Sequence, residues 1–320
     1  MIKIGLIGLG HLGKIHLKLL KEIEGFEIVG IYDVNDELKK DLAQQNNLHA
    51  CNSYEELLEL SQAIDIVTPS VTHFELAATA IEQGKHVFIE KPVTPTVNDA
   101  LKLLQLNQQK KVVIQIGHVE RFNPAYTSCV SLFKTPHLIE FKRFAIYNPR
   151  GTDVSVTLDL MVHDLDILLD IVKSPVKKIS ARGRTEISDT SDFAEASIEF
   201  ENGCIAILST HRNASSNQRE ITVYQDNIII NLDLLQKKSV INDFGNIKKT
   251  DRDSLKNTGE KDVLIKYPII SPSNAIKDEL MAFHKSITTG EKPAVTLEEA
   301  IEVLKMVQII DEKILNQTIK

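Results

Sequence analysis

The sequence predicts an α/β protein of two domains, with a doubly wound parallel sheet first and an α+β domain after it. In the first 120 residues, short apolar runs alternate with helical patterns, which is typical of a parallel sheet covered by helices. Beyond a long apolar helix that ends near residue 172, strand patterns follow one another with only turns between them, which is typical of antiparallel pairing. A chain of 320 residues is long enough for two domains, which we place at residues 1–120 and 121–320.

Five continuous apolar runs predict the strands of the first domain, since strands covered on both faces carry few polar residues. These runs are 2–8, 26–33, 63–69, 86–90 and 111–117. Ser53 with Glu56, and Thr72 with Glu75, match the capping box that opens a helix. Gly84 predicts a left-handed helix end.

The second domain begins with a short helix and a strand, followed by a long apolar helix. We predict these at 123–133, 137–145 and 158–172. The strands that follow are predicted at 176–185, 193–200, 204–210, 219–226 and 227–234. Residues 242–261 are rich in Asn, Lys, Asp and Gly and predict a mobile loop. Two helices close the chain, one at 274–289 and one opened by Thr296 and Glu299.

A glycine pattern connects the first strand to the first helix. The spacing G-x-G-x-x-G falls on Gly8, Gly10 and Gly13. In this context the first glycine permits a tight turn, the second admits a pyrophosphate, and the third allows the helix to pack closely on the strand. The helix start at His11 and Leu12 would offer free N–H groups to the phosphates. These residues predict a dinucleotide-binding site.

Asp33 ends the second strand, where an acidic side chain hydrogen-bonds the adenosine ribose. A carboxylate there favours NAD, because it would repel the 2′-phosphate of NADP. Asn35 lies near the same ribose position. NADP therefore stays an alternative cofactor.

The apolar helix at 158–172 carries charged residues at spacings of four, three and four, so that they share one face. They are Asp159, His163, Asp166 and Asp170. Charges on a buried helix need partners or a wet cavity. Structural ion pairs are an open alternative for Asp166 and Asp170. The pair Asp159 and His163 is better suited to orient and tune a base near neutral pH.

Lys91 lies at the carboxyl end of a predicted parallel strand, where α/β proteins place their chemistry. As an ammonium it can polarise a substrate oxygen, and it acts as a base only if its surroundings lower its pKa. Glu90 should point to the other side of the strand, because successive strand residues alternate. Pro92 redirects the chain out of the strand.

Three segments resemble the glucose–fructose oxidoreductase and inositol dehydrogenase (Gfo/Idh/MocA) family. They read GLGHLGKIH, TPSVTHFELAATAIEQGKHVFIEKPVT and DLMVHDLD. The resemblance runs over nearly the whole chain. It implies an N-terminal Rossmann domain that binds NAD(P), and a C-terminal α+β domain with a large, mostly antiparallel sheet for substrate binding and oligomerisation.

By this resemblance, Lys91 matches the catalytic lysine, Asp159 a substrate-orienting aspartate and His163 the acid/base histidine. The segment beside the cofactor corresponds to Thr68, Pro69 and His73, with Glu90 and Lys91 counted among the cofactor-binding residues. His73 is also consistent with an exposed helix-start histidine that binds nothing.

The implied reaction is the reversible oxidation of a secondary alcohol of a sugar, polyol or sugar nucleotide. GHVERFNPAY and LDLMVHDLDI resemble the branch that oxidises the 3-hydroxyl of UDP-N-acetylglucosamine. We expect His118, Arg121 and Arg150 to bind substrate together with Lys91, Asp159 and His163. Open alternatives are a non-sugar substrate of the biliverdin or dihydrodiol type, and a regulator that senses NAD without catalysis.

Composition narrows the partners and the compartment. A net charge of -7 argues against nucleic-acid binding. We find no membrane-length apolar run and no signal peptide, and the three cysteines follow no metal spacing. We therefore expect a cytoplasmic protein without a bound metal, forming a homodimer or homotetramer through the C-terminal sheet.

Overall fold

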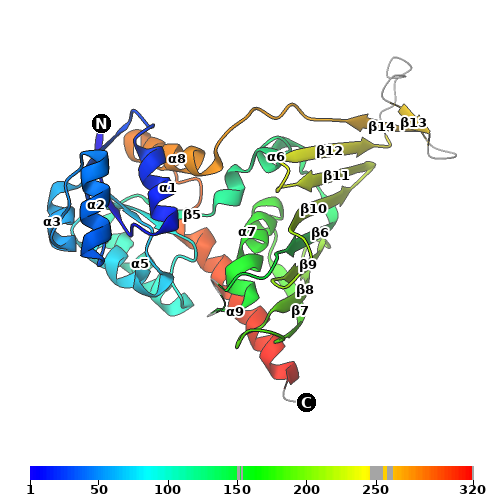
Figure 1. The fold of residues 1–320 in the computed structure, drawn as a ribbon. Coiled ribbons are helices and arrows are strands. Elements are labelled where there is room, and N and C mark those ends of the chain that lie inside the picture. The colour runs from blue at the N-terminus through cyan, green and yellow to red at the C-terminus, as the bar shows by residue number, and fades with distance from the viewer. Residues whose placement is uncertain (150–151, 153, 246–254, 258–261, 319–320) are drawn as a thin grey trace. The chain divides into compact units, whose positions relative to one another are not determined.

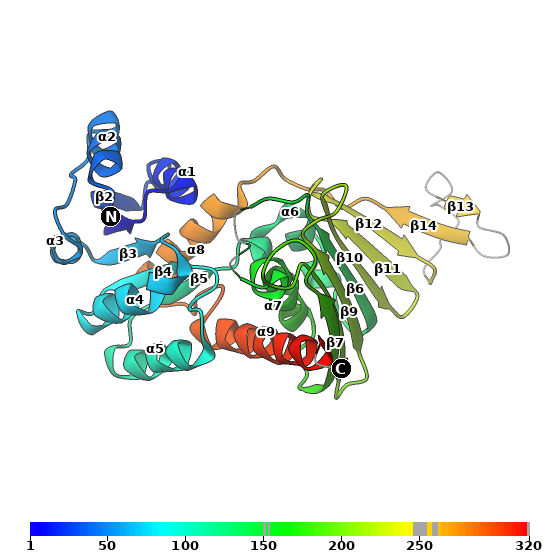
Figure 2. The ribbon, with the colours of Figure 1, turned by 60° about the horizontal axis from the view of Figure 1, so that its bottom comes forward.

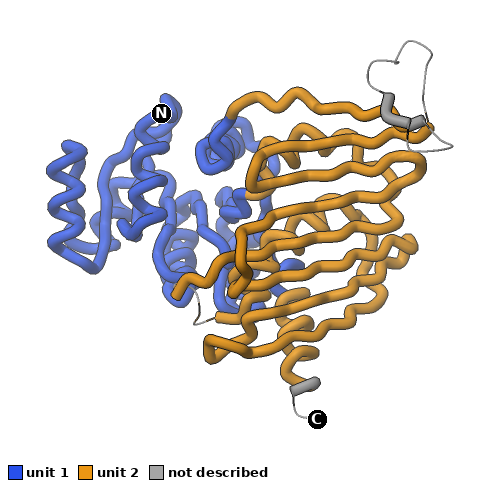
Figure 3. The backbone as a smooth tube through the Cα atoms, turned by 45° about the vertical axis from the view of Figure 1, so that its right-hand side comes forward, with its two compact units in different colours: residues 1–119, 273–304 blue, residues 120–272, 305–320 orange. Residues whose placement is uncertain are grey.

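The structure is a computed structural model that describes the chain except for residues 150–151, 153, 246–254, 258–261 and 319–320. Two compact units are present, shown in separate colours in Figure 3. Unit 1 contains residues 1–119 and 273–304, and unit 2 contains residues 120–272 and 305–320. The sequence instead predicts a second domain that is continuous from residue 121. Residues 273–304 return to the first unit.

Unit 1 is built on a parallel sheet of five strands in the order β2-β1-β3-β4-β5. Figure 1 labels β5 of this sheet, and Figure 2 labels β2, β3, β4 and β5. The strands are β1 (Ile2–Ile7), β2 (Phe26–Tyr32), β3 (Ala63–Ile66), β4 (His86–Glu90) and β5 (Ile114–Gly117). All five lie within the predicted apolar runs, and the parallel sheet is confirmed. Because the strand order reverses between β1 and β3, the carboxyl ends of these strands form the crevice where such sheets bind ligands.

Helices flank this sheet. They are α1 (His11–Leu20), α2 (Asp36–Asn46), α3 (Tyr54–Leu60), α4 (His73–Glu82), α5 (Val97–Lys110), α8 (Ala275–Thr289) and the first turns of α9 (Leu297–Thr318). Ile4 packs in a cluster with residues of α1 and α8. Gly5, the next residue along β1, faces Leu57 of α3, since a Cβ there would lie 2.7 Å from the Leu57 side chain. Both faces of the sheet are therefore covered.

Aromatic packing explains why α8 belongs to unit 1. Phe283 lies in the core of this unit, with its ring centroid 5.8 Å from that of Phe88 and 6.3 Å from that of Phe26. The backbone N–H of Ile116 also donates to Val295 O. These contacts join residues far apart in the sequence, which local patterns do not predict.

The predicted caps have mixed outcomes. Ser53 accepts from the N–H of Glu56, and Thr296 exchanges hydrogen bonds with Glu299 as a complete capping box. Gly84 has φ +72, as predicted. Thr72 is the N-cap residue of α4, but the predicted capping box does not form, because the Thr72 hydroxyl donates to Thr68 Oγ1 and Pro69 O at the end of a 3-10 turn (Ser70–Thr72).

Unit 2 contains a sheet of nine strands in the order β13-β14-β12-β11-β10-β6-β9-β8-β7. Its strands are β6 (Pro136–Phe144), β7 (Val176–Arg184), β8 (Phe193–Phe200), β9 (Ile205–His211), β10 (Gln218–Gln225), β11 (Ile228–Asp233), β12 (Lys238–Asp243), β13 (Leu255–Asn257) and β14 (Asp262–Lys266). Neighbours pair antiparallel except β6 and β9, which pair parallel. A mostly antiparallel sheet is confirmed.

The loop predicted at 242–261 is only partly correct. Residues 242–243 complete β12, and residues 255–257 form β13. Residues 246–254 and 258–261 lie outside the described part of the chain.

One face of the nine-stranded sheet is covered by α7 (Val162–Ile171) and the C-terminal part of α9 (Figure 2). The side chains of β8 alternate accordingly, with Ala194, Ala196 and Ile198 buried. No helix of the described chain covers the opposite face, where Ile205 and Ile207 are 42% and 37% exposed. This face is the exposed surface of the sheet.

The apolar helix differs from its prediction in its first turn. Residues Thr157–Met161 form a π turn, and the regular α-helix α7 begins only at Val162. The Ser155 hydroxyl accepts from the N–H of Leu158 and donates to Asp311 Oδ2 at 2.7 Å. The helix start is thus anchored to α9 within unit 2.

Candidate active site

The glycine turn after β1 has the geometry that its spacing predicts. Gly8 has φ +91, and a Cβ there would lie 2.6 Å from Val67 O. A Cβ at Gly13 would lie 1.9 Å from Gly8 O, so the helix can approach the turn this closely only because residue 13 is glycine. At Gly10 a Cβ would meet nothing within 4 Å. The backbone at Gly10 therefore borders open space.

The start of α1 is suited to an anion. Gly10 is its N-cap and offers no side-chain hydrogen bond, and His11 is exposed while Leu12 is half-buried. The first N–H groups of a helix have no partner inside the helix, and they carry the positive end of its dipole. Together with the open space at Gly10, these groups fit the pyrophosphate of a dinucleotide.

Asp33 lies at the end of β2, as predicted. Its Oδ2 accepts from the N–H of Leu9 at 2.7 Å, and its Oδ1 accepts from the N–H of Asn35 at 2.8 Å. The carboxylate thus braces the glycine turn against the loop after β2, and each oxygen keeps a lone pair for a ribose hydroxyl. Asn35 is occupied as the N-cap of α2, accepting from Leu38. Val34, which lies between Asp33 and Asn35 in the sequence, is 91% exposed.

His73 is placed differently from the exposed position that its helix start suggested. The side chain is buried, at 1% exposure, and its two ring nitrogens each lie 2.9 Å from a backbone oxygen, Nε2 from Thr68 O and Nδ1 from Pro92 O. It therefore ties the segment after β3 to the segment after β4. Thr68 is half-buried and Pro69 exposed, so that this segment stays accessible.

Lys91 follows the last residue of β4 and is half-buried, and its peptide bond to Pro92 is cis. Its backbone N–H donates to Glu90 Oε2 at 3.1 Å. Glu90 is expected among the cofactor-binding residues, but its carboxylate is buried with Oε1 3.3 Å from His16 Nε2. Lys91 and the Glu90 carboxylate thus have different surroundings, as strand alternation predicts.

In unit 2, Asp159 lines a cavity of about 590 Å³. The other lining residues are Ala145, Ile146, Tyr147, Asn148, Pro149, Leu160, Arg212 and Asn217. Asp159 is half-buried in the π turn, and His163 is half-buried in the first turn of α7. The cavity is also lined by Tyr147, Asn148 and Asn217, which the sequence did not indicate as site residues. Polar residues directly after the strand predicted at 137–145 are the signal that could have indicated the first two.

Arg121 does not have the free guanidinium expected of a substrate-binding residue. It donates to both carboxylate oxygens of Asp166, from Nε at 2.7 Å and Nη2 at 2.9 Å, and its Nη1 lies 3.0 Å from Asp170 Oδ1. The Tyr126 hydroxyl also donates to Asp170. Burial alone would raise the pKa of Asp170, but Arg121 and Tyr126 hold it below its ordinary value. Arg121, Asp166 and Asp170 thus form the structural ion pairs that were the alternative for the two aspartates.

A second ion-pair network lies nearby in the same unit. Arg143 is 3% exposed and lies 2.8 Å from Asp164 Oδ1 and 3.0 Å from Glu120 Oε1. Burial would raise the pKa of Glu120, but Arg143 lowers it overall. The two remaining substrate-binding predictions, His118 and Arg150, gain no support: His118 is buried at 2% exposure in unit 1, and Arg150 lies outside the described residues.

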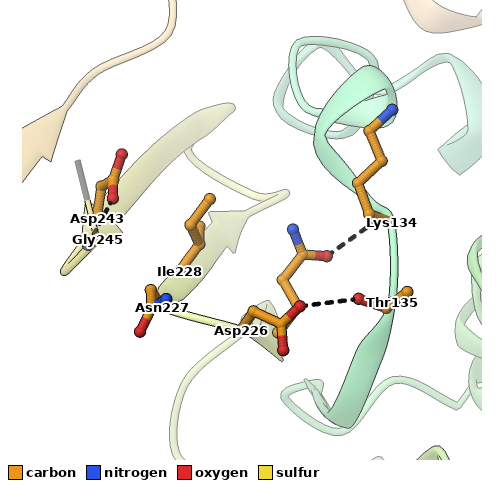
Figure 4. A pocket seen from close by; sticks show the side chains of 8 residues that line it. Lys134, Thr135, Asp226, Asn227, Ile228, Asp243 and Gly245 are labelled. Atoms are coloured by element: carbon orange, nitrogen blue, oxygen red, sulfur yellow. Dashed lines mark hydrogen bonds between the residues drawn. The ribbon is translucent and has the colours of Figure 1, made fainter.

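Another cavity, of about 290 Å³, lies beside the turn between β10 and β11 (Figure 4). Its lining residues are Lys134, Thr135, Gln225, Asp226, Asn227, Ile228, Asp243 and Gly245. The backbone N–H of Lys134 donates to Gln225 Oε1 at 3.1 Å, and Thr135 Oγ1 donates to Asp226 Oδ2 at 3.4 Å. None of the predicted site residues that the structure describes lines it.

Among the described residues, no helix is long and apolar enough to cross a membrane. Cys51, Cys129 and Cys204 are buried and form no disulfide.

Two family models match separate parts of the chain. A sequence model described as "Oxidoreductase family, NAD-binding Rossmann fold" matches residues 2–118, and one described as "GFO/IDH/MocA C-terminal domain" matches residues 131–230. The chain is 32% identical over 235 residues to UDP-N-acetylglucosamine 3-dehydrogenase from Acidithiobacillus ferrooxidans, which covers 73% of this chain and 74% of that protein.

Two further similarities extend over more of the chain. A myo-inositol 2-dehydrogenase from Thermotoga maritima is 23% identical over 318 residues, covering 93% of this chain and 92% of that protein. A solved structure of the Acidithiobacillus ferrooxidans UDP-N-acetylglucosamine 3-dehydrogenase superposes with a TM-score of 0.90 at 27% identity, covering 98% of this chain and 97% of that one. The chain therefore belongs to the Gfo/Idh/MocA family of oxidoreductases and carries an NAD-binding Rossmann domain.

Proposed function

We propose that this oxidoreductase reversibly oxidises a secondary hydroxyl of a sugar nucleotide to a ketone, with the 3-hydroxyl of UDP-N-acetylglucosamine as the favoured substrate group. The observation that carries the proposal is Asp159, which lines the cavity of about 590 Å³ from a π turn. Such turns often occur at functional sites. The relative that is 32% identical is named for this substrate.

Three side chains share the proposed chemistry. His163 takes the proton from the reacting hydroxyl, and Lys91 supplies positive charge or a hydrogen bond to the same oxygen. Asp159 orients the substrate and the imidazole. NAD, when bound at the glycine turn, accepts the hydride. The half-buried positions of all three side chains support these roles, because each is partly accessible and partly desolvated.

The lining of the cavity supports a polar, phosphorylated ligand. Its volume of about 590 Å³ lies in the range of small-molecule sites. Asn148, Asn217 and Tyr147 offer hydrogen bonds, and Arg212 adds a cation. Arg121 is held by two carboxylates at 2.7–3.0 Å, whereas Arg212 lines the cavity and its Nε lies farther, at 3.8 Å, from Asp192 Oδ1, so Arg212 replaces Arg121 as the proposed contact for a diphosphate.

The test measures NADH formation with UDP-N-acetylglucosamine, glucose 6-phosphate and myo-inositol, each with NAD and with NADP. We expect turnover on UDP-N-acetylglucosamine with NAD. Preferred turnover of myo-inositol would move the substrate to the polyols. Absence of turnover on every sugar and polyol would contradict the proposed function.

Variants test the roles of the residues. His163→Ala and Lys91→Met should each lower kcat by about 10²–10⁴-fold, as expected for loss of a proton-transferring or charge-supplying group, with the Kd for NAD unchanged. His137→Ala is the matched control, because His137 is exposed and pairs only with Asp226 among the described residues. Full activity in His163→Ala would contradict its role. A pH–rate profile of Lys91→Met beside the wild type distinguishes proton transfer from charge.

We also propose that the exposed face of the nine-stranded sheet forms a homodimer or homotetramer. Ile205 and Ile207 on β9 give this face an apolar component. Ile207→Lys should lower the molar mass measured by light scattering toward that of one chain. A wild-type protein that is monomeric would contradict this interface.

A further inference from the structure

A cluster of ionisable side chains lies in the interior of unit 1, next to the strand end that carries Lys91. We call it the core acid cluster, and it consists of His16, Asp65, Glu90 and Glu279. These residues come from four elements, α1, β3, β4 and α8. Exposure is 0% for three of them and 8% for Glu90. Of these four residues, Glu90 alone is among the predicted site residues. The predicted site and the proposed chemistry do not include His16, Asp65 or Glu279.

Hydrogen bonds connect this cluster to Lys91. His16 Nδ1 lies 2.9 Å from Asp65 Oδ2, and its Nε2 lies 3.3 Å from Glu90 Oε1. The other oxygen of Glu90 accepts from the backbone N–H of Lys91 at 3.1 Å. Gly117 leaves room for this carboxylate, since a Cβ there would lie 2.9 Å from Glu90 Oε1. Glu90 thus joins the interior of unit 1 to the backbone of Lys91.

Glu279 is the unusual member. Neither of its side-chain oxygens has a hydrogen-bond partner in the described part of the chain, although a carboxylate oxygen of Glu279 lies within 4.8 Å of ligand atoms of both His16 and Glu90. From β5, the uncharged Gln115 donates from Nε2 to the backbone oxygen of Glu279 at 2.6 Å. An ionised carboxylate without hydrogen bonds in such a place would be strongly destabilising.

The charges of the cluster also disfavour an ionised Glu279. Three carboxyl groups face one imidazole, so full ionisation would leave an excess of negative charge in the interior. Burial raises the pKa of Glu279 well above its ordinary value, and Glu90 and Asp65 raise it further, against the opposing effect of His16. Burial alone would lower the pKa of His16, but Asp65 and Glu90 raise it well above its ordinary value.

We propose that Glu279 is a neutral carboxylic acid in the folded protein, and that the core acid cluster positions Lys91 by holding the ionised Glu90 in place. His16 as an imidazolium then bridges Asp65 and Glu90, while the proton on Glu279 prevents a second negative charge beside Glu90. Glu90 is in this view a positioning residue for Lys91. That positioning role rests on the proposed function of Lys91, whereas the proton on Glu279 does not.

The first experiment tests the proton through the pH dependence of stability. Below the unfolded-state pKa of about 4.3, Glu279 is protonated in both states. Above it, the unfolded chain loses this proton while the folded protein keeps it, so stability falls with rising pH up to the folded-state pKa. The ratio of the unfolding constants, wild type over Glu279→Gln, should therefore rise about tenfold per pH unit from pH 5 to 7.

Glu82→Gln is the matched control, because Glu82 is exposed near the end of α4. Its ratio to the wild type should stay constant over the same pH range. A constant ratio for Glu279→Gln would overturn the proposal. If that variant does not fold, carbon-13 spectra of glutamate-labelled wild type should show one carboxyl group that stays protonated at pH 7, and its absence would overturn the proposal.

Metal analysis of the purified wild type addresses the other way to neutralise the cluster. The same three side chains, His16, Glu90 and Glu279, have a spacing that could hold a cation. We expect no stoichiometric metal. One equivalent of bound zinc would replace the proton with a cation and overturn the proposal.

The positioning role is tested by activity at pH 7. Glu279→Gln should keep kcat within about twofold, because a neutral amide replaces a neutral acid. Glu90→Gln should lower kcat at least tenfold with the Kd for NADH unchanged, since the amide has one acceptor oxygen and cannot accept from both His16 Nε2 and the backbone N–H of Lys91. Unchanged kcat in Glu90→Gln, or an equal loss in both variants, would overturn this role. If the wild type oxidises no sugar, the proposed function fails while the stability experiment still decides the state of Glu279.

Discussion

The two units bury charge in different ways. In unit 2, two arginines are each matched by two acids, Arg143 by Glu120 and Asp164, and Arg121 by Asp166 and Asp170. In unit 1, Glu279 makes no side-chain hydrogen bond with any described residue, and no described side chain caps α1. The difference indicates that these matched pairs hold the fold of unit 2, whereas the Glu279 carboxyl group and the start of α1 are suited to take up a proton or a ligand.

The largest expected effect comes from breaking a matched pair in unit 2. Arg143→Ala leaves Asp164 as a buried carboxylate without its arginine and leaves Glu120 with Arg219 alone at 3.3 Å, which should lower the free energy of unfolding by about 3–5 kcal/mol in urea titrations. Arg182→Ala is the control, because Arg182 is exposed and its pair with Glu195 lies at the surface. This control should lose at most about 1 kcal/mol. Equal losses in both variants would contradict the comparison.

The glycine turn of unit 1 provides a pair of variants that separates stability from binding. Gly13→Ala places a Cβ 1.9 Å from Gly8 O and should cost about 2–3 kcal/mol of stability. Gly10→Ala meets no atom within 4 Å, and φ -62 suits alanine, so stability should change by less than about 0.5 kcal/mol.

NAD binding should nevertheless weaken in Gly10→Ala. Its methyl group enters the open space assigned to the pyrophosphate, and the Kd from calorimetry should rise at least about tenfold, or about 1.4 kcal/mol. An unchanged Kd would show that this space does not receive the cofactor.

Asp192 in unit 2 gives a pH-dependent effect of intermediate size. Burial alone would raise its pKa, but hydrogen bonds from the backbone of Glu186, Ile187 and Ser188, and from the Ser188 hydroxyl, lower it to about 2. Asp192→Ala should lose about 2 kcal/mol of this stabilisation at pH 7.

The sign of this effect follows from the lowered pKa. The stabilisation is present above the unfolded-state pKa of about 3.9 and is lost as the pH falls toward 2. The difference between wild type and Asp192→Ala should therefore shrink as urea titrations approach the lowest pH at which the wild type stays folded. A difference that is constant below pH 4 would contradict this role.

The smallest effect concerns the helix caps. Thr296→Ala removes the hydroxyl that accepts from Glu299, and should cost about 1 kcal/mol in the same urea titrations. Thr72→Ala should cost less, about 0.5 kcal/mol, because its hydroxyl caps no helix and makes partly exposed hydrogen bonds. Equal costs would contradict the distinction between these two predicted capping boxes.

The parts of the fold that could be predicted from the sequence depend on local signals. Apolar runs located every strand of the parallel sheet, and the glycine spacing located the turn before α1, because these signals act within a few residues. The placement of α8 in unit 1 could not be predicted, since it depends on Phe283 meeting Phe26 and Phe88 from distant parts of the chain.

The candidate site shows the same limit. Spacing along the apolar helix correctly predicts that Asp166 and Asp170 share a face, since Arg121 contacts both. The sequence could not show that Arg121 is the partner on this face, because Arg121 and Asp166 are 45 residues apart in the chain. Likewise, His73 could be placed at a helix start, but the two backbone oxygens that bury its ring come from the segments after β3 and β4.

The π turn at Thr157–Met161 has a consequence for how such sites diverge. A π turn winds one residue more into the helix than an α turn does, and one residue corresponds to a rotation of about 100° around the helix axis. Deleting a single residue there would rotate Asp159 relative to His163 without substituting either. Relatives that differ by one residue in this turn would present a different side chain to the cavity, so that specificity can change by the length of the chain instead of its composition.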